Sequence, residues 1–117
     1  MDTMQTIDRE ELKDRLEGGE SLTLILVQGM WAFERCHIPG SITFASREAA
    51  LAVLHPDDEI VVYCSGGPCP ASAVAYRLLT ERGYRQVRHY AGGLDDWAAA
   101  GYSLAGELAA ETSLGGR

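Results

Sequence analysis

A single cysteine, Cys64, marks the point in the sequence that most restricts the fold, because the pattern changes on either side of it. Residues 60–63 form a short β-branched and aromatic run, which is long enough for a buried strand and too short for a helix. Residues 65–70, rich in glycine and proline, continue neither a strand nor a helix. From Ala71 onward, apolar residues recur at the spacing of one helix face, and Gly83 then provides a stop signal. The sequence therefore predicts a strand that ends at a cysteine just before an amphipathic helix.

This position favours a reactive thiol at Cys64. The N-terminus of a helix presents unpaired N–H groups and the positive end of the helix dipole, and both stabilise a thiolate over a thiol. Gly66 and Gly67 allow successive backbone amides to turn toward one point, forming a nest for an anion or for the outer sulfur of a modified cysteine. Pro70 suits the first helical position, and together with Pro68 it stiffens the loop. The alternative is a buried structural cysteine beside a glycine turn.

The rest of the chain alternates helices with strands. Asp8 and Glu11 have the spacing of a capping box, so a helix is expected to begin at residue 9 and to end at Gly18-Gly19. Ser46 is the expected N-cap of another helix. By the same rules we expect helices over residues 9–17, 29–36, 46–54 and 70–82 and between residues 93 and 101, and strands over residues 22–27, 41–44, 60–63 and 86–90. This order predicts an α/β fold with a small parallel β-sheet and helices on both faces, in which ligands bind outside the carboxyl ends of the strands.

The length and charge of the chain restrict its class and partners. Its 117 residues suit one domain, which we place at residues 1–102, with residues 103–117 as a C-terminal extension or tail. A net charge of −7 argues against nucleic acid and anionic membranes as partners. No apolar run approaches membrane-spanning length and the first residues do not resemble a signal peptide, so a cytoplasmic location is expected. Three cysteines fit reduced thiols with chemical roles better than a disulfide framework.

Several motifs spread over nearly the whole chain occur in an informative order. They are Glu10-Glu11-Leu12, Phe33-Glu34-Arg35-Cys36-His37-Ile38-Pro39-Gly40-Ser41, Val61-Val62-Tyr63-Cys64, Gly83-Tyr84 with Val87, and Ala91-Gly92-Gly93-Leu94 with Trp97 and Gly101. Together they resemble a single rhodanese domain, of the family of persulfide-forming sulfurtransferases. The resemblance implies a rhodanese-like fold in which Cys64 accepts a sulfane sulfur, holds it as a persulfide among loop amides, and passes it to a thiophilic acceptor.

The sequence departs from the family pattern in three places. Residues 26–28 read Leu-Val-Gln where the family usually has Asp-x-Arg, so the ion pair or hydrogen bonds of those residues are replaced or absent. Residues 65–69 contain no basic residue to help bind thiosulfate, and the loop looks like a variant that holds a second cysteine, Cys69, and continues to Ser72. The phosphatases related to rhodaneses need Cys-x5-Arg for bidentate phosphate contacts, and Pro70 stands at that position. Phosphatase and arsenate reductase activities are therefore not expected.

The candidate site consists of Cys64 as the catalytic residue and of substrate-binding residues in the loop and the first helical turn, namely Ser65, Gly66, Gly67, Pro68, Cys69 and Ser72. Cys69 is either a resolving thiol, which would discharge a persulfide or a sulfenate as a disulfide, or a small residue near the helix start. Cys36-His37 lacks the spacing of a known zinc site, so no metal is expected, and no cofactor is expected either. His55 and His89 have no obvious partners in the sequence.

Two function classes remain open. The first is a small sulfurtransferase or persulfide carrier that uses Cys64, with a small-molecule or protein sulfur donor and a thiophilic acceptor as its partners. The intact cysteine and the glycine nest favour this class. The second is a non-catalytic rhodanese-like module that binds a partner or senses oxidants through Cys64 and Cys69. The missing basic residue and the altered end of the first strand favour this second class.

Overall fold

The computed structural model describes residues 5–18, 22–27, 34, 36–44, 46–64, 70–102 and 104–105. The helices and strands in these ranges are, in chain order, α1 (Arg9–Glu17), β1 (Leu22–Leu26), α3 (Arg47–Val53), β2 (Glu59–Tyr63), α4 (Pro70–Glu81), β3 (Gln86–His89) and α5 (Gly93–Ala99). The three strands are parallel, and β2 lies between β1 and β3. The predicted α/β fold with a small parallel sheet is therefore confirmed.

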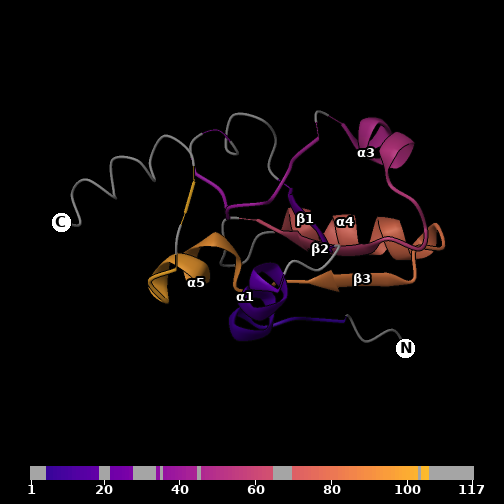
Figure 1. Cartoon of the computed structure of the whole chain (residues 1–117). Coiled ribbons are helices and arrows are strands. Elements are labelled where there is room, and N and C mark those ends of the chain that lie inside the picture. The colour runs from indigo at the N-terminus through magenta and orange to yellow at the C-terminus, as the bar shows by residue number, and fades with distance from the viewer. Residues whose placement is uncertain are drawn as a thin grey trace.

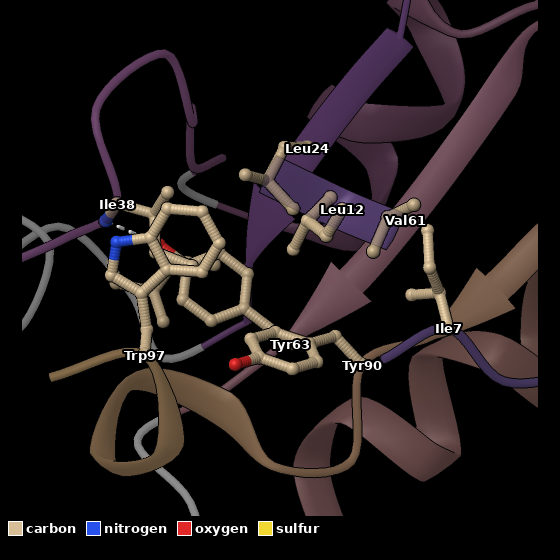
Figure 2. Packing of buried hydrophobic residues seen from close by; sticks show 9 residues of the cluster. Ile7, Leu12, Leu24, Ile38, Val61, Tyr63, Tyr90 and Trp97 are labelled. Carbon is tan, nitrogen blue, oxygen red and sulfur yellow. Dashed lines mark hydrogen bonds between the residues drawn. The ribbon is translucent and has the colours of Figure 1, made fainter. Parts of the chain in front are cut away.

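The sheet carries a hydrophobic core on each face, because successive side chains of a strand point to opposite sides. On one face, Tyr63 of β2 belongs to a buried cluster with Leu12 of α1 and Trp97 of α5 (Figure 2). On the other face, Val62 of β2 belongs to a second cluster with Leu79 of α4. Helices α1 and α5 thus lie on the opposite side of the sheet from α3 and α4 (Figure 1).

Local capping signals set the helix ends as the sequence predicts. The Asp8 side chain accepts a hydrogen bond from the backbone N of Glu11 at 2.8 Å, and α1 begins directly after Asp8. The Ser46 hydroxyl accepts from the backbone N of Ala49 at 3.1 Å and so caps α3. After α4, Gly83 has a φ of +94°, a left-handed conformation that only glycine adopts without strain. The capping bonds of Asp8 and Ser46 satisfy N–H groups that the start of a helix leaves unpaired.

Short segments pair with both edges of the three-stranded sheet. Beside β1, the predicted strand at 41–44 is reduced to a single bridge, in which Ile42 pairs with Ile25. Beside β3, the N-terminal segment pairs with His89, whose backbone N donates to the carbonyl of Gln5 at 2.8 Å. The helix expected at 29–36 falls largely outside the described residues. Edge pairing of this kind satisfies backbone groups that would otherwise be open to another chain.

A buried hydroxyl joins β2 to the turn at residues 38–41. The backbone N of Ile38 donates to the hydroxyl of Tyr63 at 3.0 Å, a bond drawn in Figure 2. The Ser41 hydroxyl donates to the carbonyl of Ile38 at 2.7 Å, so the Tyr63 hydroxyl is left to donate to Ser41 Oγ at 2.9 Å. Gly40 has a φ of +90°, which suits a glycine that follows Pro39 in a tight turn. The turn is thereby fixed to the central strand.

The C-terminal part of the described chain packs back onto this turn. His37 and Ala105 form an antiparallel bridge with backbone hydrogen bonds of 2.9 Å in both directions. Residues 106–117 lie outside the described residues, so the boundary placed at residue 102 stays a prediction. Within the described ranges, each helix is too short or too polar to span a bilayer.

The Tyr63 hydroxyl should matter for stability. We expect Tyr63→Phe to lower the free energy of unfolding by about 1 to 3 kcal/mol, because the buried N–H of Ile38 would lose its acceptor. Urea denaturation measures the change. Val53→Ala, at a side chain that is 60% exposed, serves as the control and should change stability by less than about 0.5 kcal/mol. Equal stability of Tyr63→Phe and the wild type would show that this bond does not hold the turn.

Candidate functional site

Cys64 lies directly after the central strand β2, at the carboxyl edge of the sheet. Alternation along the strand places its side chain on the same face as Val62, which is the face covered by α4. The side chain is 3% exposed. Its backbone carbonyl accepts a hydrogen bond from the N–H of Leu94 in α5 at 2.9 Å. The main chain at Cys64 is therefore held from one side of the sheet while the sulfur points to the other.

The sulfur of Cys64 lies at one end of a chain of three polar side chains. Cys64 Sγ is 3.5 Å from the hydroxyl oxygen of Ser72, which is in the first turn of α4. The same oxygen is 2.7 Å from Nε2 of His89, the last residue of β3. Three elements thus contribute one side chain each. The cysteine, the hydroxyl and the imidazole form a continuous hydrogen-bonded path.

Burial sets the electrostatics of this path. Ser72 is 2% exposed, and its position between Cys64 and His89 satisfies its hydroxyl. Burial lowers the pKa of the His89 imidazole below its ordinary value of 6.5, because the charged form loses solvation. The ring is therefore neutral near pH 7. A neutral imidazole has one nitrogen that accepts a hydrogen bond or a proton.

The cysteines differ in state. Cys64 takes part in a disulfide in this structure, and in that form it does not titrate. Cys36 is a free thiol, and burial raises its pKa. The third cysteine of the chain, Cys69, lies outside the described residues. Cys36 is thus a weaker nucleophile near neutral pH than an ordinary cysteine, because the thiolate is the reactive form.

Two of the predicted site residues, Cys64 and Ser72, come together in the structure. The predicted residues between them, namely Ser65, Gly66, Gly67, Pro68 and Cys69, lie outside the described residues. His89 was not predicted. The alternation of side chains along β3 places His89 on the same face as Val87, and the sequence shows this alternation. It does not show that β3 lies beside β2, and without that pairing His89 cannot be assigned to the site of Cys64.

An apolar cavity of about 310 Å³ occupies the same face of the sheet, between β1, α3 and α4. Its lining side chains include Val27, Phe44, Leu51, Val62 and Leu78, and no lining residue is ionisable. Among the described residues, no three His, Cys, Asp or Glu side chains are grouped as metal ligands.

Leu26 occupies the place where the sequence departs from the usual Asp-x-Arg. Its side chain is 1% exposed and belongs to the core that contains Tyr63. Its carbonyl accepts a hydrogen bond from the Thr43 hydroxyl at 2.8 Å, and its backbone N donates to the carbonyl of Ile42 at 2.9 Å. Packing and backbone hydrogen bonds therefore hold the described part of this strand end. Gln28 lies outside the described residues.

Comparisons with known proteins identify one family. The family model described as the rhodanese-like domain matches residues 8–100. The chain is 30% identical over 93 residues to the putative sulfur carrier protein YrkF of Bacillus subtilis, covering 78% of this chain and 49% of that protein. It is 32% identical over 97 residues to the probable adenylyltransferase/sulfurtransferase MoeZ of Mycobacterium tuberculosis, covering 80% of this chain and 24% of that protein. The chain thus matches about half of the first relative and about a quarter of the second.

Solved structures agree with this match. The rhodanese-like domain of the Alr3790 protein from Anabaena superimposes with a TM-score of 0.76 at 28% sequence identity. The superposition covers 91% of this chain and 82% of that one. The described sheet and helices therefore follow an arrangement already seen in an experimental structure.

The lowered pKa of His89 should make stability depend on pH. The folded state binds this proton less readily than the unfolded state, so the contribution of His89 to stability is complete above the unfolded value and falls as the pH drops below it. As the pH is lowered from about 7.5 to about 5.5, we expect the free energy of unfolding of the wild type to fall relative to that of His89→Gln. Urea denaturation at both values measures the difference, with the exposed His55→Gln as control. A constant difference between wild type and His89→Gln would contradict the expectation.

Proposed function

The chain belongs to the rhodanese-like domain family, and on that premise we propose that it is a sulfurtransferase or persulfide carrier in which Cys64 accepts and donates sulfane sulfur. The position of Cys64 supports the proposal most directly. It follows the central strand, precedes α4, and touches a hydroxyl in an otherwise apolar core. The relatives that are named a sulfur carrier and a sulfurtransferase support the same reaction class.

The proposed reaction begins with reduction of the disulfide at Cys64 by an external thiol or dithiol, which is itself oxidised to a disulfide, because a sulfur in a disulfide is not a nucleophile. The thiolate then attacks the outer sulfur of a persulfide or thiosulfate, which releases a thiolate or sulfite and leaves a persulfide on Cys64. A thiophilic acceptor, either a small molecule or a protein, removes that sulfur. In this proposal Ser65, Gly66, Gly67, Pro68 and Cys69 surround the outer sulfur, as the sequence suggests.

The same proposal bears on cofactors, location and partners. The chemistry needs no metal and no cofactor, since the Cys64 thiolate supplies the electron pair of the new sulfur–sulfur bond and the leaving group keeps the pair of the broken one. Free thiols persist in reducing compartments, so the proposed location is the cytoplasm. The net charge of −7 disfavours nucleic acid as a partner.

A second candidate function is thiol-based sensing of oxidants. The disulfide at Cys64 favours it, because a cysteine that exists as a thiol or in a disulfide is able to report the redox state of its surroundings. In that case reduced Cys64 would oxidise with peroxide but would take no sulfur from any donor. Sulfur loading therefore separates the two functions.

Loading of Cys64 is the first test of the proposed function. Reduced protein treated with a small-molecule persulfide should gain the mass of one sulfur atom, and Cys64→Ser should abolish the gain. Cys36→Ser is the matched control and should keep it, because Cys36 is a partly buried thiol with a raised pKa. Intact-mass spectrometry measures both. An undiminished gain in Cys64→Ser would exclude Cys64 as the acceptor of sulfur.

The choice of donor is the second test. Thiosulfate is a dianion, while the protein has a net charge of −7 and the loop at 65–69 has no basic residue. We expect weak thiosulfate use by the wild type and an apparent affinity roughly ten-fold higher in Ser65→Arg, because a charge-assisted hydrogen bond is worth about 1.5 to 3 kcal/mol and about 1.4 kcal/mol is ten-fold in affinity. Steady-state assays with thiosulfate and with a persulfide measure the effect. Efficient turnover of dilute thiosulfate by the wild type would refute this expectation.

A further inference from the structure

Three buried or half-buried polar side chains meet on the α4 face of the sheet. Cys64 and Ser72 are 3% and 2% exposed, and the half-buried His89 completes the path with a 2.7 Å bond between its Nε2 and Ser72 Oγ. Of the described residues, the buried polar side chains are Ser41 and Ser72. Ser41 belongs to the turn held by Tyr63, whereas Ser72 joins a nucleophile to a base.

The register of the sheet aligns the two ends of the path. Val62 of β2 is the partner of His89 in β3, so Cys64 comes two residues after the partner of His89 and points to the same face. Ser72, in the first turn of α4, lies over both strands at this edge. The main chain of His89 is fixed as well, because its N–H donates to Gln5 and its carbonyl accepts from Ile7. The imidazole is thus held at one place by backbone pairing.

The available protons permit one direction of proton transfer along the path. In the reduced protein the Cys64 thiol is able to donate to Ser72 Oγ, which leaves the Ser72 hydroxyl to donate to Nε2 of His89. This arrangement requires a neutral imidazole with its proton on the other ring nitrogen. Burial lowers the pKa of His89, which keeps the ring neutral near pH 7 and ready to accept.

We propose that Ser72 and His89 form a proton path for Cys64. In this path, His89 receives the proton of the Cys64 thiol through Ser72 and holds it while the sulfur acts as a nucleophile. Because His89 acts through Ser72, it is a positioning residue. This inference rests on the sulfur transfer proposed above and adds the acid–base part of that reaction.

The step balances with the persulfide of a thiol as donor. The S–H bond of Cys64 breaks, its proton moves to Ser72 Oγ, and the proton of Ser72 moves to His89 Nε2. The electron pair left on Cys64 forms a bond with the outer sulfur of the donor, and the sulfur–sulfur bond of the donor breaks. The departing thiolate takes back the proton from His89 through Ser72, which leaves a thiol and a persulfide on Cys64. No external oxidant or reductant is consumed in this step.

Among the described groups around His89, no other side chain is placed to hold the proton of the Cys64 thiol. On α4, Tyr76 lies one turn after Ser72, and its hydroxyl accepts from the backbone N of Gln5 at 2.8 Å, while Arg77 is exposed. The N-terminal segment, residues 5–7, has no ionisable side chain. The neighbouring Arg88 donates to the carboxylate of Glu11 and is thereby engaged elsewhere. Desolvation accounts for the pKa shift of His89, without a contribution from a charged neighbour.

The test measures the alkylation rate of reduced Cys64 over a pH series, with the adduct located by peptide mass. We expect His89→Gln and Ser72→Ala each to raise the apparent pKa of Cys64 by about one unit, and so to slow alkylation near pH 7 by roughly ten-fold. Glutamine retains a hydrogen-bonding group near the position of Nε2 but does not take up a proton, so it separates proton holding from support of the fold. Tyr84→Phe, which removes the buried hydrogen bond from the Tyr84 hydroxyl to the carbonyl of Leu54 on the same face of the sheet, is the matched control and should leave the profile unchanged.

The outcomes separate this inference from the proposed function. An unchanged pH profile in His89→Gln would overturn the proton path and reduce the Ser72–His89 bond to a structural contact. An equal shift in Tyr84→Phe would also overturn it, since the effect would then come from packing. Alkylation requires no sulfur donor, so the path is tested even if no donor loads Cys64. Conversely, equal rates of sulfur loading in His89→Gln and in the wild type would leave the proposed function intact while refuting the path.

Discussion

The hydroxyl of Tyr63 is the polar group on which the arrangement around Cys64 depends. It lies in a core of apolar side chains and bonds to both Ile38 and Ser41, so it fixes the turn at residues 38–41 against the central strand. Burial raises the pKa of Tyr63 and outweighs the bonds to Ser41 and Ile38, which act in the opposite direction, so the hydroxyl stays protonated and able to donate. Because Tyr63 immediately precedes Cys64, whatever holds the tyrosine also limits where the cysteine lies. The turn at residues 38–41, which is distant from Cys64 in the sequence, therefore helps to fix the position of the sulfur.

Two neighbouring residues of one strand serve opposite faces of the sheet. Tyr63 points toward α1 and α5 and contributes to stability, while Cys64 points toward α4 and its serine. A shift of one residue in the register of β2 would exchange these faces and bury the sulfur in the aromatic core. The parallel pairing of β2 with both β1 and β3 opposes such a shift. Precise placement of the thiol is therefore a property of the sheet as a whole.

Local signals in the sequence are sufficient to predict much of the fold. The caps at Asp8 and Ser46 and the stop at Gly83 depend on residues within a few positions, and each is present in the structure. The strand expected at 41–44 is a single bridge, since its pairing with β1 depends on a distant partner, Ile25, rather than on its own composition.

The candidate site was only half predictable for the same reason. Cys64 and Ser72 follow one another across a loop and were found from local pattern. The hydrogen bond between Ser72 and His89 depends on β3 lying beside β2, and the order of strands in a sheet cannot be predicted from a local sequence pattern. The odd cysteine count favours reduced thiols over a disulfide framework, and the sequence offers a disulfide at Cys64 only as one of the two alternatives for Cys69. Non-local pairing and redox state are the two properties that the sequence pattern does not encode.

The pairing of residues 5–7 with His89 links the chemistry of the site to the outer edge of the sheet. Gln5 and Ile7 hold the main chain of His89 from this edge, and the hydroxyl of Tyr76 holds Gln5 in turn. On its other side, His89 pairs with Val62 of β2. Edge pairs open with lower free energies than central strands. The imidazole that faces Ser72 thus stands on a strand supported from both sides, and one of these supports comes from residues that never touch the sulfur.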